Sequence, residues 1–191
     1  MKKGQLIQLR PEARVEDMSD AGLLAACAAE DRTARALLFE RHVDAVHRFV
    51  ARMRASDADS VDDVVQATFV RAFQGAVRFH GTSARSWLYG IAANVVREHA
   101  RKEIRRKRAM SVVAEELPRA TRTPDAHLLA RLPDAIAALP HELRTAFVFV
   151  DLEGEKGCDA AAALGIPEGT LWRRLFHART ALRKAIDGGK P

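Results

Sequence analysis

The stretch from Cys158 to Ile186 reads CDAAAALGIPEGTLWRRLFHARTALRKAI and decides the fold of the C-terminal part of the chain. An alanine-rich segment of helical character, residues 158–164, is followed by the turn Gly165-Ile166-Pro167 and by a longer helical pattern over residues 168–186. Glycine at position 165 can supply the positive φ that a tight turn between two helices requires. A short helix, a short turn with glycine and a longer helix form the layout of a helix-turn-helix.

The longer helix of this motif has two faces of different chemistry. An apolar stripe, expected to be buried, is formed by Leu171, Leu175, Ala178, Leu182 and Ile186. Arginines can pair with guanine edges or contact phosphates, and aromatic side chains on an exposed helix face are unusual. We therefore expect the opposite face to enter a DNA major groove through Thr170, Trp172, Arg173, Arg174, Phe176, His177 and Arg179. The alternative interpretation is a helical hairpin whose basic face is only solvated.

A second amphipathic helix is predicted in the middle of the chain, with Ser83 as its N-cap. Its apolar stripe includes Leu88, Ala92 and Val95. Polar residues that recur every three or four positions form a separate stripe on another face. An asparagine can bond a base edge through both its amide atoms, and arginines beyond it neutralise phosphates. The second stripe is therefore a candidate DNA contact formed by Asn94, Arg97, Arg101 and Arg105.

Helical periodicity continues through most of the chain, and no strictly alternating run of β-branched residues predicts a strand. Residues 111–125 contain Pro118 and Pro124 and lose the basic density that precedes them, which is typical of a linker. We expect an all-α fold with two small helical domains joined by a linker, the C-terminal one a helix-turn-helix. The expected divisions are a tail at 1–18, a first domain at 19–110, the linker at 111–125 and a second domain at 126–187.

The composition narrows the function classes. Hydrophobic residues make up 48% of the 191 residues, enough for a core, and 31 basic residues exceed 25 acidic ones, which suits an anionic partner. Cys27 and Cys158 are isolated, so a zinc site of the usual spacing is not expected, and a reducing cytoplasm is the simpler location. No apolar run approaches the length of a membrane span, and no signal-peptide pattern begins the chain. We expect no metal, no cofactor and no direct membrane insertion.

Two other function classes are an enzyme and a stand-alone repressor. An enzyme is not expected, because His42 and His47 are spaced to lie on different helix faces and no nucleophile–base set or phosphate-binding glycine loop is present. A stand-alone helix-turn-helix repressor would explain the C-terminal half. It would leave residues 63–73 and the basic central helix without a role, and it should dimerise on a two-fold site.

With both halves described, the chain resembles the extracytoplasmic-function group of sigma-70-type RNA polymerase sigma factors. Residues 63–73, DVVQATFVRAF, are similar to the family's D-x-V-Q-x-T-F-x-R-A-W segment, and residues 87–94, WLYGIAAN, to W-L-Y-x-I-A-x-N. Leu139-Pro140 and residues 165–171, GIPEGTL, resemble the L-P and G-[IV]-P-x-G-T-[VL] signatures, and residues 174–179 match R-[LI]-x-x-A-R. The motifs occur in the family's order, separated by a linker of suitable length.

The resemblance implies a promoter-recognition factor for RNA polymerase. Asp63, Gln66 and Phe69 would bind the β′ clamp helices of core RNA polymerase, and the β flap would be a further polymerase contact. The helix led by Asn94 would read the −10 element, the 79–86 loop would hold a flipped base, and the last helix would read the −35 element. An anti-sigma factor is the other partner that the resemblance implies.

Three departures from the family pattern limit how far the roles carry over. Ala67 stands where a glutamate is common, which removes one polymerase contact. The 79–86 loop is one residue shorter than usual, so a base pocket is not assigned residue by residue. Trp172, Arg173 and His177 replace common residues on the last helix, so no −35 sequence preference is transferred.

Overall fold

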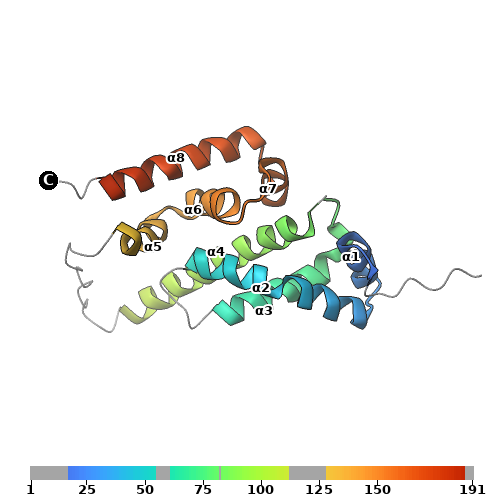
Figure 1. The fold of residues 1–191 in the computed structure, drawn as a ribbon. Coiled ribbons are helices and arrows are strands. Elements are labelled where there is room, and N and C mark those ends of the chain that lie inside the picture. The colour runs from blue at the N-terminus through green and yellow to red at the C-terminus, as the bar shows by residue number, and fades with distance from the viewer. Residues whose placement is uncertain (1–16, 55–60, 82, 112–127, 188–191) are drawn as a thin grey trace, which may run out of the picture.

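The computed structural model describes residues 17–54, 61–81, 83–111 and 128–187, and these residues contain helices and no β-strand (Figure 1). The expected tail and linker fall almost wholly outside the described residues. In the N-terminal half the elements are α1 (Asp20–Ala28), α2 (Arg32–Arg54), α3 (Val61–Gly75), the 3₁₀ turn η3 (Ala76–Arg78) and α4 (Ala84–Ser111). In the C-terminal half they are α5 (Leu128–Ala138), α6 (His141–Phe147), the π-helical η4 (Val148–Leu152), α7 (Gly157–Leu164) and α8 (Glu168–Asp187).

Three helices of the N-terminal half begin at side chains that cap free backbone N–H groups. The Ser19 hydroxyl accepts from the Gly22 amide at 3.3 Å, and the Asp31 carboxylate accepts from Ala34 at 3.0 Å. The Ser83 hydroxyl accepts from the Ser86 amide at 3.1 Å. Because the first turn of a helix leaves its amides without intrahelical partners, these caps set where α1, α2 and α4 start.

The N-terminal domain is a bundle in which α2, α3 and α4 pack on one another, with α1 across one end of α2. Its fully buried side chains include Phe49 of α2, Val64 of α3 and Leu88 of α4. A smaller cluster around Leu23 and Leu24 closes the end beneath α1. The arrangement holds α4 by one side and leaves its other side to solvent.

The C-terminal domain consists of α5 to α8, with α8 packed on α6 and α5. Ala178 and Leu182 of α8 meet Ile136 and Leu139 in its core. Gly165 ends α7 with a φ of 64°, and the Ile166 amide donates to the Ala161 carbonyl at 3.1 Å. The left-handed glycine is the turn that the sequence predicted, and it confirms the helix-turn-helix geometry.

The two domains are packed together. The main core cluster runs from α2, α3 and α4 into α6, η4, α7 and α8. Its centre is the Phe149 ring, 5.2 Å from the Phe49 ring and 5.7 Å from the Tyr89 ring. Figure 1 shows α6 and α7 layered against the N-terminal helices. The sequence predicted the two all-α domains, but it did not predict that they share an interior.

None of the helices within the described ranges is long and apolar enough to cross a membrane.

Candidate nucleic-acid interface

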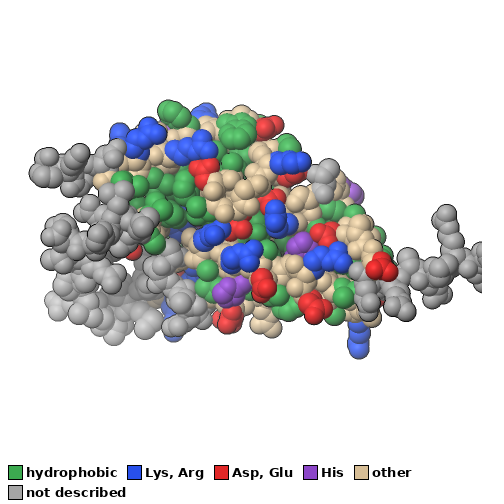
Figure 2. Space-filling view, in the orientation of Figure 1, with side chains coloured by type: hydrophobic (Ala, Val, Ile, Leu, Met, Phe, Trp, Pro, Cys, Tyr) green, Lys and Arg blue, Asp and Glu red, His purple; other side chains and the backbone are tan. Residues whose placement is uncertain are grey.

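The α8 helix separates its two faces as its sequence pattern predicts. Leu171, Leu175 and Ala178 are fully buried, whereas Trp172 and Phe176 on the opposite side are 45% and 65% exposed. Exposing a phenylalanine to this extent has no structural benefit, so the side chain is available for a partner. Figure 2 shows Lys and Arg side chains gathered along the edge over α8, with hydrophobic side chains between them.

The arginines of α8 differ in how far they are already engaged. Arg174 forms an ion pair with Glu142 of α6 at 2.8 Å, and Arg179 donates to both carboxylate oxygens of Asp151 at 2.9 and 2.6 Å. The bonds to Asp151 raise the pKa of Arg179. Arg173 and His177 are exposed and have no ion-pair partner within the described residues. Arg173 is therefore the arginine of this face that is most available to an anionic ligand.

The start of α8 is fixed with the help of Glu168 and Gly157, which the sequence pattern did not single out. Thr170 is half-buried, and the Trp172 indole N–H donates to the Glu168 carboxylate at 3.0 Å. Gly157, at the start of α7, faces the Trp172 ring so closely that a Cβ there would lie 2.5 Å from Cζ2. Because only glycine fits this approach, Gly157 lets the bracing helix pack on Trp172 and fixes the indole.

The α4 helix carries the second candidate DNA face. Asn94, Arg97, Arg101 and Arg105 are all exposed, as predicted. The Arg97 guanidinium donates to the Asn94 amide oxygen at 3.0 Å, which orients the asparagine side chain. Arg97 is therefore placed to hold the amide as well as to attract phosphate.

Helix α3 adds residues to this face that the sequence analysis missed. Arg71 donates to both oxygens of Glu98 on α4 at 2.9 and 2.6 Å, which raises the pKa of Arg71 and lowers that of Glu98. A groove between α3 and α4 is lined by Arg71, Gln74, Arg78, Trp87, Ile91, Asn94, Arg97 and Glu98. Two sequence signals pointed to them. Arg71 is the arginine of the 63–73 motif, and Arg71, Gln74 and Arg78 recur every three or four residues as a second polar stripe.

The residues predicted to bind polymerase do not all reach the surface. Asp63 and Gln66 are exposed on α3. Phe69 is only 2% exposed, so the expectation that it contacts polymerase directly is not supported by its position. Its ring packs edge-on against Phe39 of α2 at 4.7 Å, and Phe39 is 42% exposed. The aromatic side chain that this surface offers is Phe39, which lies outside the apolar stripe of its own helix.

The histidines of α2 occupy different positions, as their spacing predicted. His42 is buried and its Nε2 lies 2.9 Å from the Asp20 carboxylate, whereas His47 is at the surface, 3.5 Å from Asp62. Within the described ranges, no group of three or more His, Cys, Asp or Glu side chains is arranged to hold a metal ion.

Comparison with known proteins connects these two faces to one family. Residues 38–106 match the family profile of sigma-70 region 2, and residues 129–182 match that of sigma-70 region 4. The chain is 33% identical over 171 residues to the ECF RNA polymerase sigma factor SigM of Mycobacterium tuberculosis, covering 89% of this chain and 86% of the relative. It is 38% identical over 143 residues to the probable RNA polymerase sigma-C factor of Mycobacterium bovis, covering 72% and 75%.

Two solved structures are similar in fold. The structure of CnrH in complex with the cytosolic domain of CnrY superimposes with a TM-score of 0.64 at 26% identity, covering 90% of this chain and 99% of that one. The sigma factor RpoE from Bartonella quintana, in complex with the anti-sigma factor NepR, gives 0.62 at 24% identity, covering 78% and 94%. The two profiles, the two relatives and the two basic helices agree, and the chain belongs to the extracytoplasmic-function group of sigma-70 sigma factors.

Proposed function

We propose that this sigma factor, bound to core RNA polymerase, reads promoter −10 elements through α4 and −35 elements through α8. As a member of its family it directs core polymerase to specific promoters and so initiates transcription. It acts by binding and is not itself an enzyme, since the polymerase supplies the chemistry. The observation that carries the proposal is that α4 and α8 each place an apolar side in a core and a polar, arginine-bearing side at the surface.

The −35 role of α8 rests on the side chains that this helix exposes to solvent. Arg173, Phe176 and His177 project from the helix that follows the Gly165 turn, where a helix-turn-helix presents its recognition residues. Thr170, Trp172, Arg174 and Arg179 flank them. Arginine provides bidentate bonds to guanine or a phosphate contact, and the aromatic ring provides apolar contact in the groove.

The −10 role of α4 rests on Asn94 and the arginines beyond it. The amide of Asn94 is exposed and is held by Arg97, while Arg101 and Arg105 continue the same stripe toward the end of the helix. The asparagine is suited to base edges, and the arginines to the backbone. Trp87, in the groove beside Asn94, supplies an aromatic surface on which an unpaired base can stack.

Each proposed contact with RNA polymerase is assigned to a surface of one of the two domains. Asp63 and Gln66, together with the exposed Phe39, form the surface of α2 and α3 that we assign to the β′ clamp helices. The C-terminal domain would contact the β flap. Core polymerase places these events in the cytoplasm. Because the two solved relatives above are bound to the cytosolic domain of CnrY and to the anti-sigma factor NepR, an anti-sigma partner is proposed for this chain too.

Run-off transcription with purified core polymerase on a library of genomic fragments tests the proposal. Adding the full chain should produce transcripts with defined start points that core polymerase alone does not make. Asn94→Ala is the variant to compare with the parent chain, because the Asn94 side chain is exposed and its loss should leave the fold intact. A chain that forms a dimer, binds duplex DNA without core polymerase and yields no new transcript would instead be a stand-alone repressor.

A further inference from the structure

The Trp172 ring of α8 is fixed against the start of α7. A Cβ on Gly157 would lie 2.5 Å from Cζ2 of the indole, 3.1 Å from Cε2 and 3.2 Å from Cη2. The six-membered ring therefore lies directly on the backbone of Gly157. Any residue with a side chain at position 157 would occupy the place of the ring and displace it.

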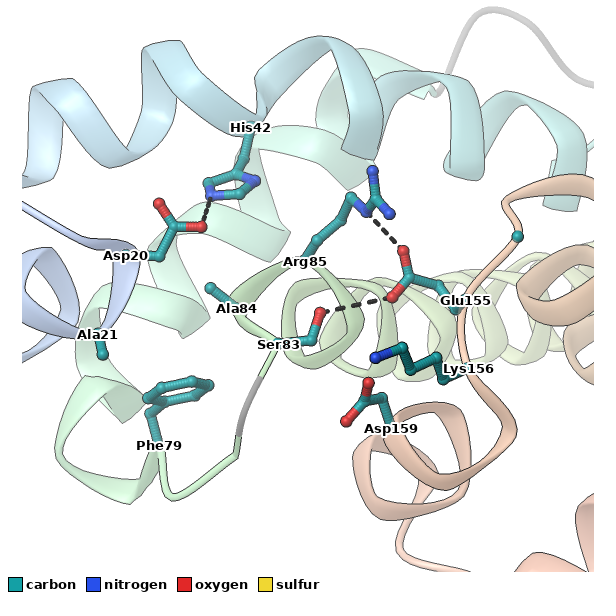
Figure 3. A pocket seen from close by; sticks show the side chains of 11 residues that line it. Asp20, Ala21, His42, Phe79, Ser83, Ala84, Arg85, Glu155, Lys156 and Asp159 are labelled. Carbon is teal, nitrogen blue, oxygen red and sulfur yellow. Dashed lines mark hydrogen bonds and ion pairs between the residues drawn. The ribbon is translucent and has the colours of Figure 1, made fainter.

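The first turn of α7 leaves Gly157 free for this contact. Lys156 and Asp159, on either side of it in the sequence, line a cavity of about 510 Å³ that α7 shares with α1 and α4 (Figure 3). Glu155 lines the same cavity; its side chain is only 4% exposed, and Arg85 Nε donates to it at 2.5 Å. The side chains at this end of α7 thus face the cavity, and the position without a side chain faces the indole.

The one polar atom of the Trp172 side chain is already bonded. The indole N–H donates to the carboxylate of Glu168, one turn earlier in α8, at 3.0 Å. An indole has no other hydrogen-bonding atom. Because Trp172 is 45% exposed, the surface that it still offers to a partner consists of carbon atoms.

The position of Trp172 favours a base over the DNA backbone as the partner of this carbon surface. Trp172 lies one turn into α8 (Glu168–Asp187), and the N-terminal residues of a recognition helix contact base edges. The carboxylate of Glu168 beside the ring repels phosphates. Among the groups that base pairs present in the major groove, the apolar one is the C5 methyl group of thymine. An indole without a free donor is complementary to that methyl group.

We propose, on the basis of the −35 role assigned to α8, that Trp172 contacts a thymine methyl group in the −35 element. Glu168 and Gly157 are positioning residues, because they hold the indole in place without contacting the base. Glu168 also occupies the indole N–H, which prevents the ring from donating to a base acceptor instead. The contact makes the factor prefer a thymine opposite the first turns of α8.

The test uses holoenzyme formed from core RNA polymerase and the full chain. The preferred −35 element is selected from fluorescent promoter DNA in which the −35 region is randomised. Each thymine of the selected element is then replaced by deoxyuridine, which lacks only the methyl group. At one position the replacement should weaken binding by about fourfold, the factor that corresponds to burying one methyl-sized group. A selected element without a preferred thymine, or one that tolerates deoxyuridine everywhere, would overturn the methyl contact and leave the −35 role intact.

The ratio of the affinities for thymine and deoxyuridine DNA is the readout for variants, because a general loss of folding or of DNA binding cancels in it. Trp172→Ala should bring the ratio close to one. Gly157→Ala should do the same, since its methyl group displaces the indole while the DNA face keeps all its side chains. Glu168→Ala should lower the ratio, whereas Glu168→Gln should preserve it, because the amide oxygen still accepts from the indole.

Two control variants should keep the parent's ratio. Lys156→Ala changes the exposed neighbour of Gly157, and Phe176→Ala removes the other exposed aromatic ring of α8. A ratio that falls in Phe176→Ala but survives in Trp172→Ala would overturn the assignment to Trp172. Unchanged ratios in Gly157→Ala and Glu168→Ala would contradict the positioning roles. A parent holoenzyme that binds every randomised −35 sequence equally well would refute the −35 role of α8 itself, and the methyl contact with it.

Discussion

The two candidate DNA helices, α4 and α8, follow one design in different surroundings. Each buries an apolar stripe and presents a polar one, but α8 faces solvent with Phe176 65% exposed and Arg173 unpaired within the described part of the chain. On α4 the critical Asn94 is bonded to Arg97 and shares its cavity with the end of α7. The acids that pair with the arginines of α8 come from the same domain as α8. The end of α7, which lies beside Asn94 of α4, comes from the C-terminal domain.

This difference concerns the groups that surround each DNA face. On α8, Glu142 and Asp151 pair with Arg174 and Arg179 and so reduce the positive charge that this exposed face presents. On α4, Asn94 shares a cavity with the end of α7, which belongs to the other domain. The two candidate DNA faces therefore differ in which domain supplies the groups that lie beside them.

The largest predicted effect concerns Asn94. Asn94→Ala removes a base-edge contact worth about 1–3 kcal/mol, so open-complex formation should fall by roughly 5- to 150-fold. The affinity for core polymerase should stay unchanged, because the surface proposed for polymerase lies on α2 and α3. Gln66→Ala, exposed on α3, is the reciprocal control and should weaken polymerase binding instead. Equal losses of both activities in Asn94→Ala would contradict a DNA-reading role. Permanganate footprinting and a polymerase-binding titration measure the two quantities.

Much of this comparison could be predicted from sequence because it depends on local periodicity. The stripe of Leu171, Leu175 and Ala178 repeats at helical spacing, and burying it forces Trp172 and Phe176 outward. The same reasoning predicted that the Asn94 stripe of α4 faces away from the core. Gly165 was predictable because few residues other than glycine adopt a φ of 64° without strain.

The features that were not predicted depend on contacts distant in sequence. Phe69 matched a motif associated with polymerase binding, yet packing against α2 buries it and leaves Phe39 at the surface. Glu153 and Glu155 looked like ordinary acids in a loop. Their burial follows from donors on α2 and α4, 64 to 101 positions away in the chain, and no local pattern contains that information.

The second prediction tests where the C-terminal domain approaches the arginines of α4. Burial of His141 at the start of α6, together with the nearby Arg97, Arg144 and Arg101, lowers its pKa from 6.5 to about 4, while Glu142 acts in the opposite direction. The folded protein thus binds fewer protons than the unfolded chain between these values. The contribution of neutral His141 to the free energy of unfolding is therefore complete above pH 6.5 and is lost as the pH falls toward 4.

Because the His141 side chain is partly exposed, we expect the loss to be about 1–2 kcal/mol. Urea unfolding at several pH values measures it, and the comparison is made with His141→Gln, which cannot titrate. The free energy of unfolding of the parent, relative to that of His141→Gln, should decrease as the pH falls from 6.5 to about 4. A constant difference would show that His141 titrates normally and is not buried against the basic helix.

The third prediction ranks two adjacent arginines of α8. Arg173→Ala should weaken binding to duplex −35 DNA by about 1 kcal/mol and lower the salt slope by about one, as expected for the loss of one phosphate or base contact. Arg174→Ala should cost less, because Arg174 is paired with Glu142 at 2.8 Å and only 24% exposed. Fluorescence anisotropy across a salt series measures both. The reverse ranking would mean that the ion pair with Glu142 breaks on DNA binding.

The smallest predicted effect has the opposite sign. Asp151→Asn removes the carboxylate that accepts two bonds from Arg179, so the guanidinium is released and a negative charge next to the DNA face is lost. An exposed ion pair is worth about 0.2–1 kcal/mol, and duplex affinity should therefore rise by at most about fivefold with a steeper salt dependence. Glu142→Gln should do the same through Arg174. Weaker binding by Asp151→Asn would show that the carboxylate positions Arg179 for DNA, whereas a gain would establish that acids of its own domain tune the charge of α8.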